Sequence, residues 1–153
     1  MNNTDPIEIL LVEDNPADVA LAEEALRERS VASRLNAVGD VDEALAFLRR
    51  QGNHAHSPQP DLILLDLKLP GKDGLEFLAE IKADKSLRRI PVIVLTTSNA
   101  PEDILSAYDL QASCYITKPA DLANFERVMN SIQDFCLTVV KLPPHDCIEC
   151  LVD

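Results

Sequence analysis

Short apolar runs alternate with stretches of helical periodicity along the chain, and this alternation limits the folds open to it. Continuous apolar runs at residues 9–12, 62–65 and 92–95 are typical of strands buried on both faces of a parallel sheet. Weaker runs at residues 35–38 and 113–117 fit strands at the edges of the same sheet. Between the runs, apolar residues recur three or four positions apart, as they do in amphipathic helices.

The helical stretches carry start signals and a regular order. Asn15 is a helix cap and Pro16 suits the first helical position. Five strands that alternate with helices predict an α/β fold, a doubly wound parallel (βα)5 sheet with helices on both faces. Right-handed crossovers and the weak edge runs favour the flavodoxin-like strand order 2-1-3-4-5. The helices are expected after Asn15, from residue 41, over 74–84, over 101–110 and from residue 121.

Length and charge restrict the function. The 153 residues suit one domain, which we assign to residues 1–142, with residues 143–153 as a tail and no output domain. The net charge of −12 and the lack of a basic cluster argue against DNA binding. No apolar run is long enough for a membrane helix, and the N-terminus carries no secretory signal. These features predict a cytoplasmic protein without a membrane partner.

The tail contains a cysteine pair, Cys147 and Cys150, with His145 before it. One such pair does not make a four-ligand zinc site. A redox pair normally lies at a helix start after a strand. We therefore assign no function to this pair, and the purpose of the tail stays open.

Polar residues follow the predicted strands at the edge where ligands bind in such sheets. Three carboxylates that converge there repel one another and favour a hard cation such as Mg²⁺. A carboxylate can also be the nucleophile toward a phosphoryl group, while a hydroxyl and an ammonium group bind phosphate oxygens. Phosphoryl transfer is the chemistry this set predicts. Its members are Glu13 and Asp14 after the first strand, Asp66 at the end of the third, Thr96 and Thr97 at the end of the fourth, and Lys118 after the fifth.

Four motifs in these places resemble the signature of receiver domains in two-component signalling. They are LVEDN at 11–15, DLKLPGKDG at 66–74, VLTTS at 94–98 and YITKP at 115–119. The resemblance extends over residues 7–140. It implies a response regulator that receives a phosphoryl group from a sensor histidine kinase and loses it slowly, without turnover of a separate substrate. On this reading the chain is a switch and not an enzyme.

The resemblance also implies a role for each acidic residue. Asp66 would be the phosphoacceptor. Mg²⁺ would be held by Glu13, Asp14, Asp66 and the backbone carbonyl of Lys68. The Lys68 side chain itself is as well explained by simple solvation.

The remaining motif residues would bind phosphate and carry the switch. Thr96 would be the hydroxyl that moves toward the phosphoryl group, with Thr97 beside it, and Lys118 would pair with phosphate. Tyr115 would turn inward when Thr96 moves. A cis peptide bond would precede Pro119.

A narrower resemblance concerns partners. Residues 95–98, 114–122 and 135–143 resemble the single-domain regulators that pair with cyanobacterial phytochromes. The chain departs from them at Cys136, where a tryptophan is frequent, and in its 147–150 ending. A phytochrome-type histidine kinase is the implied partner. Output would go to a downstream protein or a phosphotransfer protein, and the apolar residues 137–142 suggest a homodimer as a further hypothesis.

Two rival functions remain. A pseudo-receiver would be a binding module that is not phosphorylated, and the intact motif set argues against it. A phosphohydrolase of the haloacid-dehalogenase type also uses an aspartate nucleophile on an α/β sheet. That class needs an aspartate two residues after the nucleophile, where this chain has Lys68.

Overall fold

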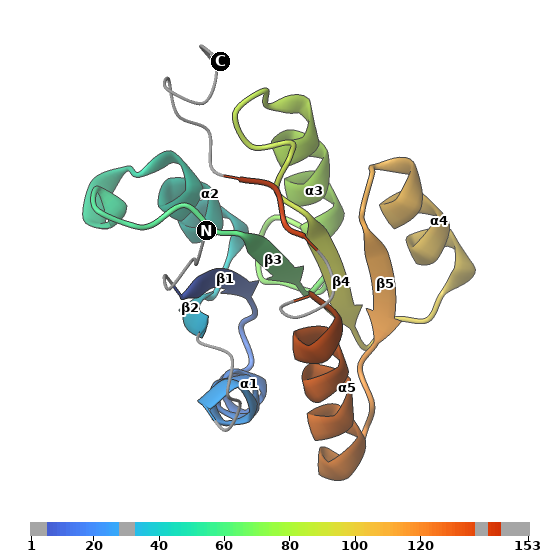
Figure 1. The fold of residues 1–153 in the computed structure, drawn as a ribbon. Coiled ribbons are helices and arrows are strands. Elements are labelled where there is room, and N and C mark those ends of the chain that lie inside the picture. The colour runs from blue at the N-terminus through green and yellow to red at the C-terminus, as the bar shows by residue number, and fades with distance from the viewer. Residues whose placement is uncertain (1–5, 28–32, 137–140, 145–153) are drawn as a thin grey trace.

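The five predicted strands form one parallel sheet in the order β2-β1-β3-β4-β5 (Figure 1), as expected. The structure is a computed structural model, and it describes residues 6–27, 33–136 and 141–144. Cys147 and Cys150 of the expected tail lie outside these ranges, and so do the apolar residues 137, 139 and 140. The strands are β1 Ile7–Val12, β2 Ser33–Val38, β3 Leu62–Leu65, β4 Val92–Thr96 and β5 Cys114–Thr117.

A helix follows each strand, which confirms the flavodoxin-like fold. The helices are α1 Pro16–Arg27, α2 Val41–Arg49, α3 Gly74–Ala83, α4 Pro101–Asp109 and α5 Leu122–Asp134, with a short 3-10 turn, η1 Gly52–His54, in the loop before β3. Side chains cap four of the helices: Asn15 for α1, Asp40 for α2, Asp73 in a capping box for α3, and Asp121 for α5. None of the helices in the described part of the chain is long and apolar enough to cross a membrane.

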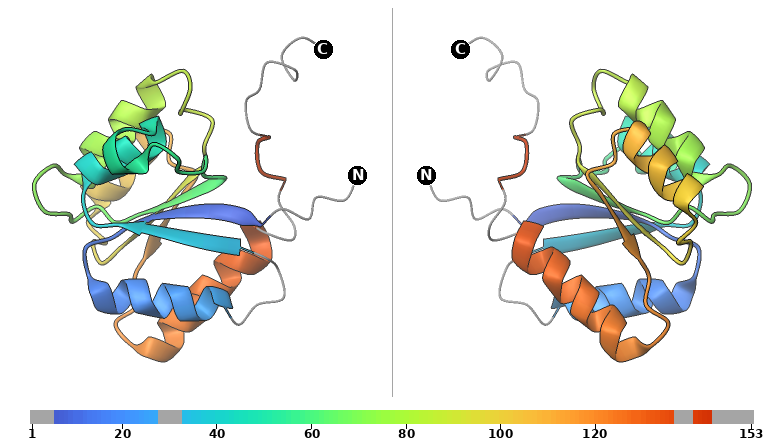
Figure 2. Two further views of the ribbon diagram at one scale, coloured as in Figure 1. Left: turned by 90° about the vertical axis from the view of Figure 1, so that its left-hand side faces the viewer. Right: turned by 90° about the vertical axis from the view of Figure 1, so that its right-hand side faces the viewer.

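The helices cover both faces of the sheet (Figure 2). Helices α1 and α5 lie on one face, and α2, α3 and α4 lie on the other. Alternate residues of each central strand point into the two cores. Leu10 and Ile63 pack with Phe77 of α3, while Ile9 and Leu64 belong to the core that includes Met129 of α5. The central strands are therefore buried on both faces, as their unbroken apolar runs predicted.

The parallel register brings the carboxyl ends of the strands to one edge. Val12 of β1 pairs with Leu65 of β3, so the residues that follow them, Glu13 and Asp66, start side by side. The backbone extends this alignment, because the Asp66 N–H donates to the Val12 carbonyl at 3.0 Å. The fold thus delivers the polar strand ends to a common place.

Candidate functional site

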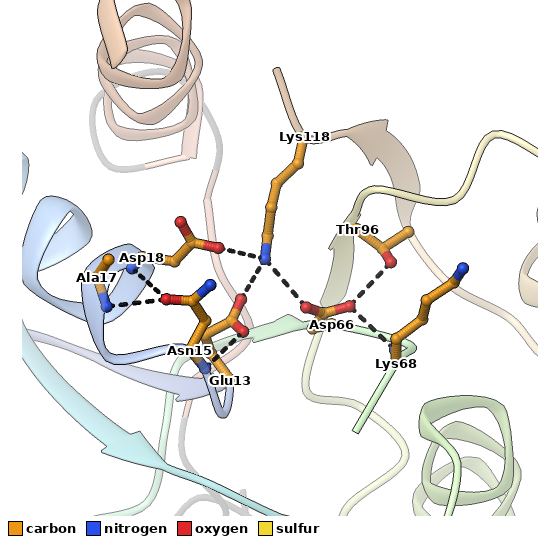
Figure 3. Close-up of polar contacts among 8 residues, drawn as sticks. All are labelled: Glu13, Asn15, Ala17, Asp18, Asp66, Lys68, Thr96 and Lys118. Carbon is orange, nitrogen blue, oxygen red and sulfur yellow. Dashed lines mark hydrogen bonds and ion pairs between the residues drawn. The ribbon is translucent and has the colours of Figure 1, made fainter. Parts of the chain in front are cut away.

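The acidic residues expected at this edge converge (Figure 3). Glu13, Asp14 and Asp66 each offer a carboxylate oxygen, and these three atoms lie within 4.8 Å of one another. Glu13 and Asp66 are 4% and 6% exposed, whereas Asp14 faces solvent. The neighbouring Lys118 and Thr96 point at the same centre. The structure thus assembles most of the set that the sequence predicted.

Asp66 is held through both of its carboxylate oxygens. Its Oδ1 accepts hydrogen bonds from the Thr96 hydroxyl at 2.8 Å and from the backbone N–H of Lys68 at 3.0 Å. Its Oδ2 accepts from the Lys118 ammonium at 3.0 Å. Burial pushes the pKa of Asp66 upward, but the hydrogen bonds from Lys68, Lys118 and Thr96 outweigh it and leave the pKa below its ordinary value. Asp66 is therefore an ionised, oriented carboxylate.

Lys118 is the buried cation of the site. Its ammonium group donates to Glu13 Oε1 at 2.5 Å and to Asp18 Oδ2 at 2.7 Å, besides Asp66. Burial favours the neutral amine, but the hydrogen bonds that Lys118 donates to Asp18, Glu13 and Asp66 prevail and raise the pKa of Lys118. The lysine stays charged and offsets part of the repulsion among the carboxylates.

Glu13 responds differently from Asp66. Burial raises the pKa of Glu13 above its ordinary value, and the charge of Asp66 adds to this, against the hydrogen bonds from Lys118 and the Asn15 backbone. The pKa values of the two carboxyl groups are thus pushed in opposite directions. The site is short of positive charge, since a single buried ammonium faces several carboxylates.

The donor set fits a hard divalent cation. Three carboxylates with no sulfur or imidazole suit Mg²⁺ or a similar ion that prefers oxygen ligands. The exposed Asp14 leaves the cluster open to solvent on one side, as a cation that keeps its water ligands requires. Lys68 contacts Asp66 through its backbone N–H, and its side chain is exposed.

Glycine residues shape the loop after Asp66. A Cβ atom on Gly74 would lie 2.6 Å from the Asp66 carbonyl oxygen and 2.7 Å from Leu67 Cα, so only glycine fits this close approach. The Gly74 N–H also donates to the Leu67 carbonyl at 3.1 Å. Gly71 has φ of +76°, which glycine adopts without strain. The start of α3 is thereby packed directly against the backbone that carries Asp66.

Two predicted switch residues lie farther away. Thr97 is exposed and has no hydrogen bond to the acidic cluster in the described part of the chain. The Tyr115 hydroxyl donates to the Ser98 carbonyl at 2.8 Å, and the buried Ser98 hydroxyl in turn bonds Asp103 of α4. Tyr115 is therefore tied to the loop between β4 and α4, two residues beyond Thr96.

The expectation of a cis bond before Pro119 is wrong in this structure. No peptide bond among the described residues is cis. The trans form is the lower in energy for most X–Pro bonds, by roughly 0.5–1 kcal/mol, so a cis bond requires a local reason. With the trans bond in place, the Lys118 N–H bonds the Thr96 carbonyl at 2.6 Å and the Lys118 ammonium reaches Asp66.

The sequence reasoning missed Asp18, the third carboxylate on Lys118. Its position could have been inferred from the Asn15 cap. Asn15 Oδ1 accepts from the backbone of Ala17 at 2.9 Å and of Asp18 at 3.3 Å, which fixes Asp18 in the first turn of α1. A first-turn acid is usually explained by the helix dipole, and that general explanation hides the contact with Lys118.

Fold and site together define a small α/β domain with a cluster of carboxylates, bridged by a lysine, at the carboxyl ends of its strands. Residues 9–130 match the response regulator receiver domain family, and the chain belongs to that family of two-component systems. The response regulator Rcp1 of Synechocystis sp. is 46% identical over 138 residues, which cover 90% of this chain and 94% of that protein.

Solved structures give the same answer. The phosphorylated cyanobacterial phytochrome response regulator RcpA superposes with a TM-score of 0.88 at 48% identity, over 92% of this chain and all of that one. The Mn²⁺-bound form of Rcp1 also gives a TM-score of 0.88, at 46% identity over 91% of this chain and all of that one. The chain is thus related to phytochrome response regulators. One of these relatives carries a divalent metal ion.

Proposed function

We propose that this chain is a phosphorylated switch in which Asp66 accepts a phosphoryl group from a phosphohistidine of a sensor histidine kinase. The observation that carries the proposal is the state of Asp66: it is buried, ionised and oriented by Thr96 and Lys118, beside two further carboxylates. An ionised aspartate held in this way can act as a nucleophile toward a phosphoryl group.

The transfer step balances without any further reactant. A carboxylate oxygen of Asp66 attacks phosphorus, the P–N bond to the histidine breaks, and its electron pair returns to the imidazole nitrogen. Lys118 and Thr96, which now donate to the carboxylate, are placed to donate to the phosphoryl oxygens. Mg²⁺ held by Glu13, Asp14, Asp66 and the Lys68 carbonyl would supply charge neutralisation during the transfer.

The switch would travel from Thr96 to Tyr115. A phosphoryl group on Asp66 offers the Thr96 hydroxyl a stronger acceptor than a carboxylate oxygen. Movement of Thr96 displaces the following loop, and Ser98 in that loop accepts from Tyr115 and bonds Asp103 of α4. The equilibrium between two positions of this loop would shift with phosphorylation. The face made by α4, β5 and α5 is the surface that would change with phosphorylation. Thr97 lies in the loop between β4 and α4.

The proposed partners follow from the relatives. The likeness to RcpA and Rcp1 supports a phytochrome-type histidine kinase as phosphodonor. The output would be a downstream protein or a phosphotransfer protein, with residues 1–142 acting as one domain, and a homodimer is a further part of this proposal. A cytoplasmic location is the setting in which such a kinase acts. The chain would release phosphate slowly and turn over no separate substrate.

The test is incubation with Mg²⁺ and acetyl phosphate, read by intact mass, with Asp66→Asn as the control. One added phosphoryl group in the wild type alone is the expected result. A label that persists in Asp66→Asn would overturn the assignment of Asp66. If neither acetyl phosphate nor a phosphorylated phytochrome-type kinase labels the wild type, the pseudo-receiver alternative takes its place.

A further inference from the structure

Lys118 has a partner that belongs to neither the acidic cluster nor the phosphoacceptor. An ammonium group has three N–H donors, and all three are used here. They go to Glu13 at 2.5 Å, to Asp18 at 2.7 Å and to Asp66 at 3.0 Å (Figure 3). Glu13 and Asp66 are members of the candidate cation cluster, and Asp18 is not.

Asp18 reaches Lys118 from the first turn of α1, whereas Glu13 and Asp66 reach it from the ends of β1 and β3. Asn15 caps the helix, Pro16 opens it, and Asp18 follows in the first turn. Its side chain is 22% exposed, against 5% for Lys118, so it lies at the outer rim of the site. Its carboxylate oxygen Oδ2 accepts a hydrogen bond from the Lys118 ammonium at 2.7 Å. The contact joins α1 to the segment after β5, two parts of the chain that are 100 residues apart.

The three acceptors of Lys118 have different fates during the proposed reaction. A phosphoryl group on Asp66 replaces the carboxylate oxygen that Lys118 now contacts. A cation in the acidic cluster competes for Glu13. Asp18 alone keeps its present role through both events, because it takes part in neither.

We propose that Asp18 is a positioning residue that holds the Lys118 ammonium at the rim of the site and keeps one of its N–H donors directed at the phosphoryl group. The inference rests on the proposed function, because it assigns a role to Asp18 in the phosphorylation of Asp66. Without Asp18, Lys118 keeps its other acceptors but loses the fixed anchor that sets its direction. Phosphoryl uptake then slows although the acidic cluster is intact.

A structural role is the competing explanation. An acid in the first turn of a helix stabilises the helix through its dipole, whatever it contacts. Asp42 provides a matched control, since it is an exposed aspartate in the first turn of α2 and is not one of the three acceptors of Lys118. Asp42→Asn makes the same chemical change and the same change in net charge as Asp18→Asn.

The experiment measures the rate of phosphorylation by acetyl phosphate at saturating Mg²⁺ in the wild type, Asp18→Asn, Asp18→Glu and Asp42→Asn. We expect Asp18→Asn to be about five- to tenfold slower, as for the loss of a partly exposed charged hydrogen bond. Asp18→Glu should recover part of the rate, and Asp42→Asn should match the wild type. A rate for Asp18→Asn equal to that of Asp42→Asn, or faster than the wild type, overturns the proposal. An Asp18→Glu rate no better than that of Asp18→Asn does so too.

A second readout separates an action through Lys118 from any other. The NMR signal of the Lys118 ammonium should shift and exchange faster with solvent in Asp18→Asn, and stay unchanged in Asp42→Asn. An unchanged signal in Asp18→Asn overturns the proposal even if the rate falls. Failure of the proposed function looks different, because then the wild type itself would take up no phosphoryl group at Asp66.

Discussion

The two ends of the β-sheet bury their residues by opposite means. At the carboxyl ends of the strands, Glu13, Asp66 and Lys118 are buried, and Lys118 donates a hydrogen bond to each of the two carboxylates. At the amino ends, the described residues leave a hollow of about 560 Å³ whose lining is mainly apolar. Its lining includes Leu62, Ile93, Ile116, Val128, Ile132 and the thiols of Cys114 and Cys136.

The two ends differ in the reactivity of their buried groups. At the charged end, Glu13, Asp66 and Lys118 are paired with one another, and the lowered pKa of Asp66 keeps its carboxylate ionised. At the apolar end, burial raises the pKa of Cys114 and of Cys136, which makes both thiols poor nucleophiles at neutral pH. Substitutions at the two ends should therefore lower the free energy of unfolding for different physical reasons. Added cations should offset this loss only in variants at the charged end.

The largest expected effect comes from Lys118→Met, compared with Ile132→Ala at the apolar end. Lys118→Met leaves buried carboxylates without their cation and should lower the free energy of unfolding by roughly 3 kcal/mol. Ile132→Ala removes a side chain that is 6% exposed and should cost roughly 2–3 kcal/mol. Added Mg²⁺ should restore stability in Lys118→Met, because it neutralises the same carboxylates, and should give Ile132→Ala no more than it gives the wild type.

Urea unfolding with and without Mg²⁺ measures both variants. Equal responses to Mg²⁺ in the two variants would show that the contrast between the ends is not electrostatic.

Gly74→Ala should come next in size. The new methyl group would meet the Asp66 carbonyl oxygen and Leu67 Cα, both backbone atoms that cannot turn aside. We expect a loss of roughly 1–3 kcal/mol, together with slower phosphorylation, since the displaced backbone carries Asp66. Gly39→Ala is the control, because a Cβ there meets nothing within 4 Å. Similar unfolding midpoints for the two variants would mean that the loop after Asp66 adapts.

The third prediction concerns acid. Because the pKa of Asp66 is lower in the folded protein, Asp66 adds stability above its unfolded pKa of about 3.9, and this is lost as the pH falls through the folded value. Between about pH 4 and pH 3, without Mg²⁺, the wild type should therefore lose stability more steeply than Asp66→Asn. The raised pKa of Glu13 has the opposite sign at higher pH, which is why the comparison is made below that range. Urea unfolding at each pH gives the slopes, and parallel slopes would contradict the assignment.

The sequence was sufficient to predict the fold because the central strands are continuous apolar runs. Three unbroken apolar runs allowed only a sheet covered on both faces, and the strand ends then had to share one edge. The bounds of the edge strand β2 were harder to predict. The strand begins at Ser33, two residues before the apolar run that starts at Leu35. Arg34 there pairs with the buried Glu8 of β1 at 3.2 Å, a contact that apolar periodicity cannot reveal.

The site was predictable to the extent that it depends on strand ends. Glu13, Asp66 and Thr96 follow directly from the topology. Asp18 does not, because its contact depends on how a helix turn places a side chain opposite a residue 100 positions away. The trans bond before Pro119 was equally out of reach, because cis and trans forms of such bonds differ by little energy.

The smallest expected effect tests the link between the charged end and the surface. Tyr115→Phe removes the 2.8 Å hydrogen bond to the Ser98 carbonyl and should cost about 1 kcal/mol, measured by urea unfolding. Tyr108→Phe is the matched control, since Tyr108 is 47% exposed and its hydroxyl only accepts from the Tyr115 backbone at 3.2 Å. Tyr115→Phe should leave the phosphorylation rate within about twofold, because Tyr115 does not contact Asp66. A large fall in that rate would mean that the loop holding Ser98 acts back on the nucleophile, and the division between the reacting centre and the reporting surface would have to be redrawn.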